Sequence, residues 1–395
     1  MALKDLVIRS QLIPPRQRRG LLSRPRLEAR LLAVLDHPLT LVHAGTGYGK
    51  STALSALAAV VDPLAWYTIT EPDRDPLLFL AHLICAFERQ LPAGCEAALR
   101  ILEEATGRVP PGALTPLLNA LTLELEQDAV LVLDDYHLVA DLPEISALVE
   151  RLVDYMPPRL HVVLSCRHLP HLAPLARWRA KGQVLSIGRP ELVFTGDEVE
   201  ALFRTVYGCP LSREQAEALA AETEGWVIAL QMVWQNLQSG LAPGLDAMLG
   251  RLPSTLETLF DYLAQDVLAR QPPALQRFLL TTAVLREMQG TTCDHLLDAQ
   301  GSAATLRRLY EDGLFVVAVG EQTYRYQHLF HDFLRSRLRE QPERWRALQR
   351  RAAEGYRRAG HREESVHHLL EAQDHGAAAE HLEEIGPGLV DLGRF

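Results

Sequence analysis

The sequence predicts a doubly wound α/β domain with a mainly parallel sheet, followed by helical domains, and three observations lead to this prediction. Short, almost entirely apolar runs alternate with helix-compatible segments from about Leu39 to Phe194. After Thr195-Gly196-Asp197 these runs stop and helical patterns replace them. The 395 residues also exceed what one ordinary hydrophobic core accommodates. We therefore expect three domains and the start of a fourth.

Residues 1–195 are expected to form the α/β domain, with an arm before its first strand. Its strands are apolar along their length, as in a sheet covered on both faces. The expected strands are Leu39–His43, Leu64–Ile69, Val130–Leu133, His161–Leu164 and Val184–Ile187. The expected helices between them include Thr52–Val61, Pro76–Gln90, Thr115–Glu126 and Glu144–Tyr155.

The helical pattern of residues 196–270 predicts a helical lid domain, in which the helices are interrupted near Gly240–Gly244. Asp197 resembles the N-cap of its first helix, and Ser212, with Gln215 three residues later, resembles a second N-cap. Both assignments rest on local sequence alone.

Residues 271–340 have the element order of a winged helix: helix, helix (Ser302–Glu311), hairpin with its turn at 320–322, and helix. Residues 341–395 predict paired short helices, broken at Gly360 and Gly376, as at the start of a TPR-like helical-repeat array. So few repeats cannot bury a core alone, and we therefore expect this chain to be the N-terminal part of something longer.

The composition limits the possible functions. A formal net charge of −10 argues against a large nonspecific nucleic-acid surface in this chain. The five cysteines are scattered, without a Cys-x-x-Cys pair, which argues against a zinc site or a disulfide framework. The N-terminus lacks the apolar core of a signal peptide, and the sequence contains no apolar run of about 18 residues. We expect a cytoplasmic protein with no membrane partner.

The strongest motif follows the first expected strand and opens a helix, which is the context of a phosphate-binding P-loop. Its glycines let the backbone approach phosphates, Lys50 is expected at the β- and γ-phosphates, and Ser51 is expected to ligate Mg²⁺. A glycine-rich turn with a coincidental Lys-Ser pair is the alternative, and Ala44 replaces the first consensus glycine. The expected nucleotide-binding residues are Gly45, Thr46, Gly47, Tyr48, Gly49, Lys50, Ser51 and Thr52.

Two further strand ends carry polar residues. Val130–Leu133 is followed by Asp134 and Asp135, and parallel strands bring such ends to the edge where the P-loop lies. Asp134 is expected to hold Mg²⁺ through water, and Asp135 is expected to polarise the attacking water or to sense the metal. Arg167 follows another strand and is a candidate catalytic residue that stabilises charge on the γ-phosphate, with an ordinary surface arginine as the alternative.

With these motifs, the chain resembles the STAND class of signal-transduction ATPases, and within it the MalT-like, LuxR-family transcriptional regulators. Asp134-Asp135-Tyr136-His137 looks like the Walker B segment of that group, and Ser165-Cys166-Arg167 is similar to its sensor-1 segment. Gly225-Trp226-Val227 resembles the segment where other STAND proteins carry a glycine-x-proline nucleotide contact. Val227 replaces the proline, so Trp226 has helix packing and a nucleotide role as open alternatives.

The resemblance implies two more nucleotide contacts. His328, in Tyr326–Leu334, is similar to the winged-helix histidine that binds the β-phosphate of ADP in this class. Helix capping by His328 is the alternative, and His331 and Asp332 are alternative candidates. Arg24 lies in a strip, Leu22–Leu27, that resembles the one near adenine, although a solvated basic turn fits equally well.

The resemblance also implies a switch. An ADP-bound closed monomer would give way to an open, self-associating form selected by ATP and an unknown small-molecule or protein inducer. Slow Mg²⁺-dependent hydrolysis of ATP would reset it, and DNA would be bound only through a domain beyond this chain. The alternatives are a nucleotide-binding scaffold without turnover and a direct DNA binder using the winged helix.

Overall fold

The computed structural model describes residues 3–15, 21–104, 109–110, 112–238, 268–269, 271–311 and 315–382. The chain divides into two compact units. The first comprises Met1–Leu211 and Trp226–Ile228, and the second comprises Ser212–Gly225 and Ala229–Phe395. The expected helix break at Gly240–Gly244 and most of the expected lid after it lie outside the described residues.

The first unit is built on a parallel five-stranded sheet of order β2-β3-β4-β1-β5. The sheet confirms the predicted fold class, and each expected strand is present, β1 and β5 with the expected bounds and the other three with small changes at their ends. The order places β4 between β1 and β3, so the carboxyl ends of these three strands are neighbours. The bounds are β1 Leu39–His43, β2 Leu64–Thr68, β3 Ala129–Asp134, β4 Leu160–Cys166 and β5 Val184–Ile187.

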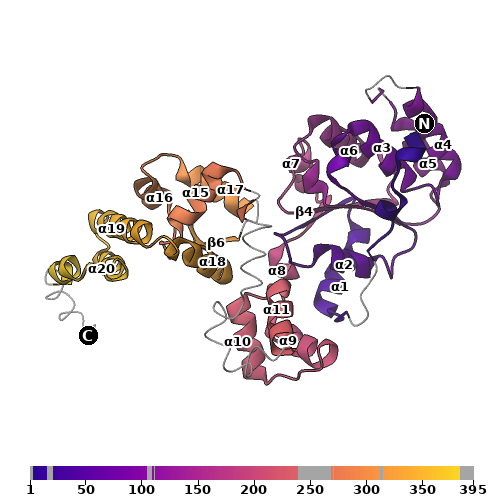
Figure 1. Ribbon diagram of the computed structural model, residues 1–395. Coiled ribbons are helices and arrows are strands. Elements are labelled where there is room, and N and C mark those ends of the chain that lie inside the picture. The colour runs from indigo at the N-terminus through magenta and orange to yellow at the C-terminus, as the bar shows by residue number, and fades with distance from the viewer. Residues whose placement is uncertain are drawn as a thin grey trace. The chain divides into compact units, whose positions relative to one another are not determined.

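Helices cover both faces of this sheet, with α1 and α2 on one face and α3 to α7 on the other (Figure 1). Alternate strand residues such as Leu131, Leu133 and Leu164 enter the core beneath α3 to α6. The bounds are α1 Pro25–Leu32, α2 Lys50–Leu57, α3 Pro76–Cys85, α4 Pro92–Glu103, α5 Thr115–Glu124, α6 Pro143–Tyr155 and α7 Leu175–Ala180. Short 3₁₀ turns lie at Leu3–Leu6, Arg9–Leu12, Ala33–Asp36, Glu71–Arg74 and Tyr136–Leu138.

The last helices of the first unit correct one prediction. After α8, Arg189–Leu192, helix α9 spans Gly196–Ala201 and continues into a π-helical turn at Leu202–Val206. Thr195 is its N-cap, not Asp197, which lies inside the first turn. The Thr195 hydroxyl accepts the backbone N–H of Glu198, and the Glu198 carboxylate accepts that of Thr195. A Thr-x-x-Glu capping box satisfies two N–H groups at once, which a lone Asp197 side chain would not.

The second unit begins with the helix that Ser212 caps as predicted, because its hydroxyl accepts the N–H of Gln215. The predicted winged helix follows, and its hairpin is antiparallel. The bounds are α10 Arg213–Thr223, α11 Val227–Gln238 (its first two residues belonging to the first unit), α15 Pro273–Thr282, α16 Gly290–Leu297, α17 Ser302–Glu311, β6 Val316–Gly320, β7 Thr323–Tyr326, α18 His328–Arg339, α19 Pro342–Arg358 and α20 Arg362–Glu371. Within the described ranges, no helix has the length and apolar character that crossing a bilayer requires.

The pair α19–α20 encloses a histidine that makes stability depend on pH. His368 is 3% exposed, lies with Nδ1 2.5 Å from the Gln349 side-chain oxygen, and stacks on Tyr356. Burial, reinforced by nearby positive charge, lowers its pKa to about 3. An unfolded histidine titrates near pH 6.5, so on acidification the unfolded chain takes up this proton first.

We therefore expect the free energy of unfolding to fall by up to about 1.4 kcal/mol per pH unit below pH 6.5 because of His368. Urea unfolding at pH 7, 6 and 5, followed by circular dichroism, measures the slope. His368→Gln keeps a hydrogen-bonding side chain beside Gln349 but does not titrate, and its slope should be shallower. Equal slopes in the two proteins would exclude His368 as the cause.

Candidate functional site

The P-loop joins the end of β1 to the start of α2. Gly47 and Gly49 both have φ of +78°, in the left-handed region where a side chain is strained, and Gly49 is the N-cap of α2. The loop therefore turns tightly and leads into the helix N-terminus. Unpaired N–H groups and the helix dipole there favour an anion.

Lys50 is the first residue of α2 and is 8% exposed. Its Nζ donates hydrogen bonds to Ala44 O (2.8 Å) and Gly45 O (3.1 Å). Burial lowers the pKa of Lys50, whereas the negative charges of Asp135 and Asp134 raise it. An ammonium that is desolvated in this way gains from an additional anion, so its position fits a phosphate ligand.

Two acids follow each other at the end of β3. Asp134 is 1% exposed, and its Oδ1 accepts the backbone N–H of Asp135 (3.1 Å). Asp135 has φ of +58° and turns the chain away from the strand. Burial and the neighbouring Asp134 raise the pKa of Asp135, while Lys50 and Arg167 lower it. Adjacent carboxylates facing a lysine are donors of the type that Mg²⁺ prefers, so the residues fit this metal.

Arg167 comes directly after β4, the strand between β1 and β3. Its positive charge lowers the pKa of Lys50 and of Asp135, which places the three groups within electrostatic reach of one another. The sheet order thus brings together Lys50, Asp134, Asp135 and Arg167 at one edge, as the sequence predicts.

His137 is a further residue at this edge, to which sequence reasoning gave no role. Its Nδ1 lies 3.7 Å from Oδ1 of Asp135, and its side chain is 8% exposed. Neither ring nitrogen has a hydrogen-bond partner among the described residues. Burial, together with the charges of Arg167 and Lys50, lowers its pKa to about 3, so His137 is neutral beside Asp135. Its signal in the sequence is its place two residues after Asp135.

Aromatic side chains flank the loop. Tyr48 is buried, and its hydroxyl accepts a hydrogen bond from Arg189 Nε (3.1 Å). Trp226, fully buried, donates from Nε1 to Thr46 O (3.1 Å). Trp226 therefore contacts the P-loop itself, a role that lay outside the two alternatives considered from the sequence.

Comparisons with known proteins find relatives of this chain among transcriptional regulators. Residues 264–346 match the family model of the MalT winged helix domain. The HTH-type transcriptional regulator MalT of Serratia proteamaculans is 30% identical over 375 residues, which cover 93% of this chain and 41% of the regulator. MalT of Yersinia enterocolitica is 29% identical over 381 residues, with 94% and 41% covered. The chain is therefore similar to MalT over most of its own length, and its residues 264–346 are similar to the MalT winged helix domain.

Structural comparison supports the fold of this MalT-like chain. The Walker-type ATPase PABY2304 of Pyrococcus abyssi superposes with a TM-score of 0.57 and 16% identity, covering 84% of this chain and 99% of that protein. The likeness shows a shared fold. The chain spans about two-fifths of the length of the curated MalT relatives that it matches.

Arg24 of the MalT-like chain has protein partners in the first unit. Its guanidinium donates to Leu192 O (2.9 Å), Val193 O (2.8 Å) and the Glu198 carboxylate (2.9 Å), and it lies over the Phe194 ring. These contacts tie the start of α1 to the segment that runs from the end of α8 into the first turn of α9. A contact between Arg24 and adenine stays a prediction.

His328 begins α18 in the second unit, and its side chain is 57% exposed. Its backbone N–H donates to the Glu224 carboxylate (3.1 Å), and its Nδ1 lies 3.6 Å from the same oxygen. His331, by contrast, bonds Ala283 O through Nε2 (2.8 Å), and burial lowers its pKa to about 4. A phosphate-binding role for His328 stays a prediction.

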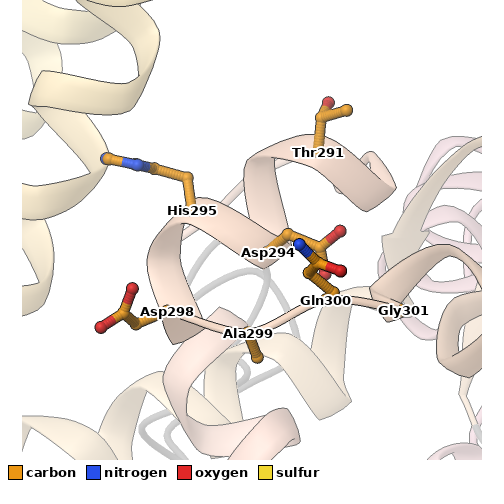
Figure 2. A pocket seen from close by; sticks show the side chains of 7 residues that line it. All are labelled: Thr291, Asp294, His295, Asp298, Ala299, Gln300 and Gly301. Carbon is orange, nitrogen blue, oxygen red and sulfur yellow. The ribbon is translucent and has the colours of Figure 1, made fainter.

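A shallow hollow on the winged helix contains none of the predicted site residues. It lies where α16 leads into α17, and in Figure 2 His295 points away from the other lining side chains. Asp294 accepts the backbone N–H of Ser302 (2.9 Å), and His295 O accepts from Arg351 Nε (3.0 Å). These two lining residues therefore connect α16 to its neighbouring helices.

Proposed function

We propose that the chain is the nucleotide-sensing part of a MalT-like transcriptional regulator, which binds ATP or ADP with Mg²⁺ at the P-loop. The observation that carries this proposal is the buried Lys50 at the start of α2, within electrostatic reach of Asp134, Asp135 and Arg167. A lysine at the start of the helix after β1, together with two acids at the end of β3, matches what a bound nucleoside triphosphate and its metal require.

In this proposal each residue has one task. Lys50 turns from the loop carbonyls to the β- and γ-phosphates, while Ser51 and Asp134 hold Mg²⁺. When bound, the metal neutralises charge on the β- and γ-phosphates. Asp135 orients and polarises the attacking water, and Arg167 stabilises charge on the transferred phosphoryl group. We expect turnover to be slow, because in a switch the hydrolysis step resets a state.

The nucleotide sets the state of the chain in this proposal. ADP holds a closed monomer, and ATP with an inducer, a small molecule or a protein, selects an open form that associates with itself. We assign DNA binding to a part of the regulator beyond this chain. The net charge of −10 makes it unfavourable for this chain to bind along the phosphate backbone of DNA. We assign the protein to the cytoplasm, as for a regulator of transcription.

His328→Ala tests the switch. If His328 donates a hydrogen bond to the β-phosphate of ADP, its loss removes a charge-assisted bond from the closed state alone. We expect the closed-to-open ratio to fall about tenfold to a hundredfold, with faster ADP release and self-association at lower ATP. Stopped-flow release of a fluorescent ADP analogue and light scattering measure the two effects.

His361→Ala, which removes another exposed histidine of the second unit, is the matched control. If His328 only caps a helix, its replacement lowers the melting temperature and leaves ADP release unchanged. That outcome would remove His328 from the switch and leave nucleotide binding at the P-loop standing.

A further inference from the structure

Three consecutive residues, Trp226 to Ile228, pack on the glycines of the P-loop within the first unit. A Cβ built on Gly47 would lie 3.0 Å from Trp226 Nε1 and 3.0 Å from Ile228 Cγ2. At Gly49 it would lie 3.6 Å from Val227 Cγ1. A side chain at Gly47 would therefore be unfavourable for two reasons. The residue has a left-handed φ, and the segment 226–228 approaches it closely.

The contact includes a directed hydrogen bond. The indole of Trp226 is completely buried, and its N–H, a donor with no acceptor function, points at Thr46 O at 3.1 Å. A buried indole ring has few rotamers, so this donor is held in place. The contact joins residues 180 positions apart in the chain.

The hydrogen bond fixes more than one atom, because the peptide group between Thr46 and Gly47 is planar. In a trans peptide the C=O and the following N–H point in opposite directions. Among the described residues the cis bond recorded is Asp62-Pro63, so the Thr46–Gly47 bond is trans. Holding Thr46 O on the Trp226 side therefore directs the N–H of Gly47 to the opposite side of the loop.

We propose that Trp226 is a positioning residue of the P-loop: its indole N–H holds Thr46 O and so keeps the Gly47 N–H directed at the bound phosphates. Backbone N–H groups of such a loop form the anion-binding concavity, and a group that is already oriented need not be ordered when the ligand binds. This inference rests on the proposed nucleotide binding and adds a residue that sets its strength.

Trp226→Phe tests the inference because it keeps a buried ring and removes the N–H. We expect the Kd for Mg-ADP and Mg-ATP, measured by calorimetry, to rise about threefold to tenfold. The matched control is Trp178→Phe on α7, which also loses a buried indole bond, from Nε1 to Asp154 Oδ1 at 2.8 Å, away from the P-loop. The control should lower the melting temperature and leave both Kd values unchanged.

The outcomes separate this inference from the proposed function. If the parent chain binds neither nucleotide, the proposed function fails, and the inference fails with it. If the parent binds and Trp226→Phe binds as tightly as Trp178→Phe, the positioning role of Trp226 is wrong and nucleotide binding stands.

Should Trp226→Phe not fold, the parent chain labelled with fluorotryptophan decides the question by ¹⁹F NMR. The signal of Trp226 is assigned by elimination, using Trp→Phe variants at the other four tryptophans. Mg-ADP is expected to shift this signal. An unshifted Trp226 signal at saturating ADP would overturn the inference.

Discussion

Replacing Lys50 with alanine is expected to weaken ATP binding by about 100-fold or more while the first unit remains folded. The ammonium is buried but its hydrogen bonds go to two loop carbonyls, so it contributes charge to the loop and little to the packing of the core. Each charge-assisted bond to a phosphate contributes about 1.5–3 kcal/mol, and two of them account for the expected loss.

Calorimetric titration with ATP and Mg²⁺ measures this effect, with circular dichroism to verify folding. Lys181→Ala is the matched control, since it removes one positive charge from an exposed position at the end of α7 in the same unit. Undiminished affinity in a folded Lys50→Ala protein would remove the assignment of the P-loop as the nucleotide site.

The two acids at the end of β3 should separate binding from turnover. Asp135→Asn keeps the proposed metal ligand Asp134, so ATP affinity should change by less than about threefold, while the rate of phosphate release falls about 100-fold or more. Asp134→Asn should instead weaken the dependence of ATP binding on Mg²⁺, because a neutral amide is a poorer ligand for this cation.

Release of phosphate under single-turnover conditions, together with ATP titrations at several Mg²⁺ concentrations, measures both effects. Asp141→Asn, which changes an exposed acid paired with Arg74 in the same unit, is the control. If Asp134→Asn and Asp135→Asn both hydrolyse ATP like the parent, catalysis does not involve this strand end. A parent chain that binds ATP without any turnover would favour the alternative function, a nucleotide-binding scaffold that does not hydrolyse ATP.

The sheet and the residues at its edge could be predicted because their signals are local. Strands buried on both faces leave continuous apolar runs, and the P-loop and the acids follow such runs directly. Helix ends are predicted less exactly, since the helix expected at Thr52–Val61 spans Lys50–Leu57. The capping box at Thr195 is also local, but it is recognised only when Thr195 is paired with Glu198 three residues later.

Contacts between distant parts of the chain could not be predicted. The bond from Trp226 to Thr46 and those from Arg24 to the segment 192–198 join residues 168 to 180 positions apart. No periodicity or motif encodes such a pairing, because it depends on how the completed domain folds back on itself. His137 is close to Asp135 in the sequence, but its burial follows from packing around the end of β3, which the sequence does not show.

A crystal structure of the chain with a non-hydrolysable ATP analogue and Mn²⁺ in place of Mg²⁺ tests the central claim most directly. The account predicts phosphates at the N-terminus of α2, with Lys50 Nζ bound to the β- and γ-phosphates. It also predicts one anomalous manganese peak beside the Ser51 hydroxyl, on the side of the phosphates that faces Asp134. Triphosphate density elsewhere, or manganese bound without either residue nearby, would contradict it.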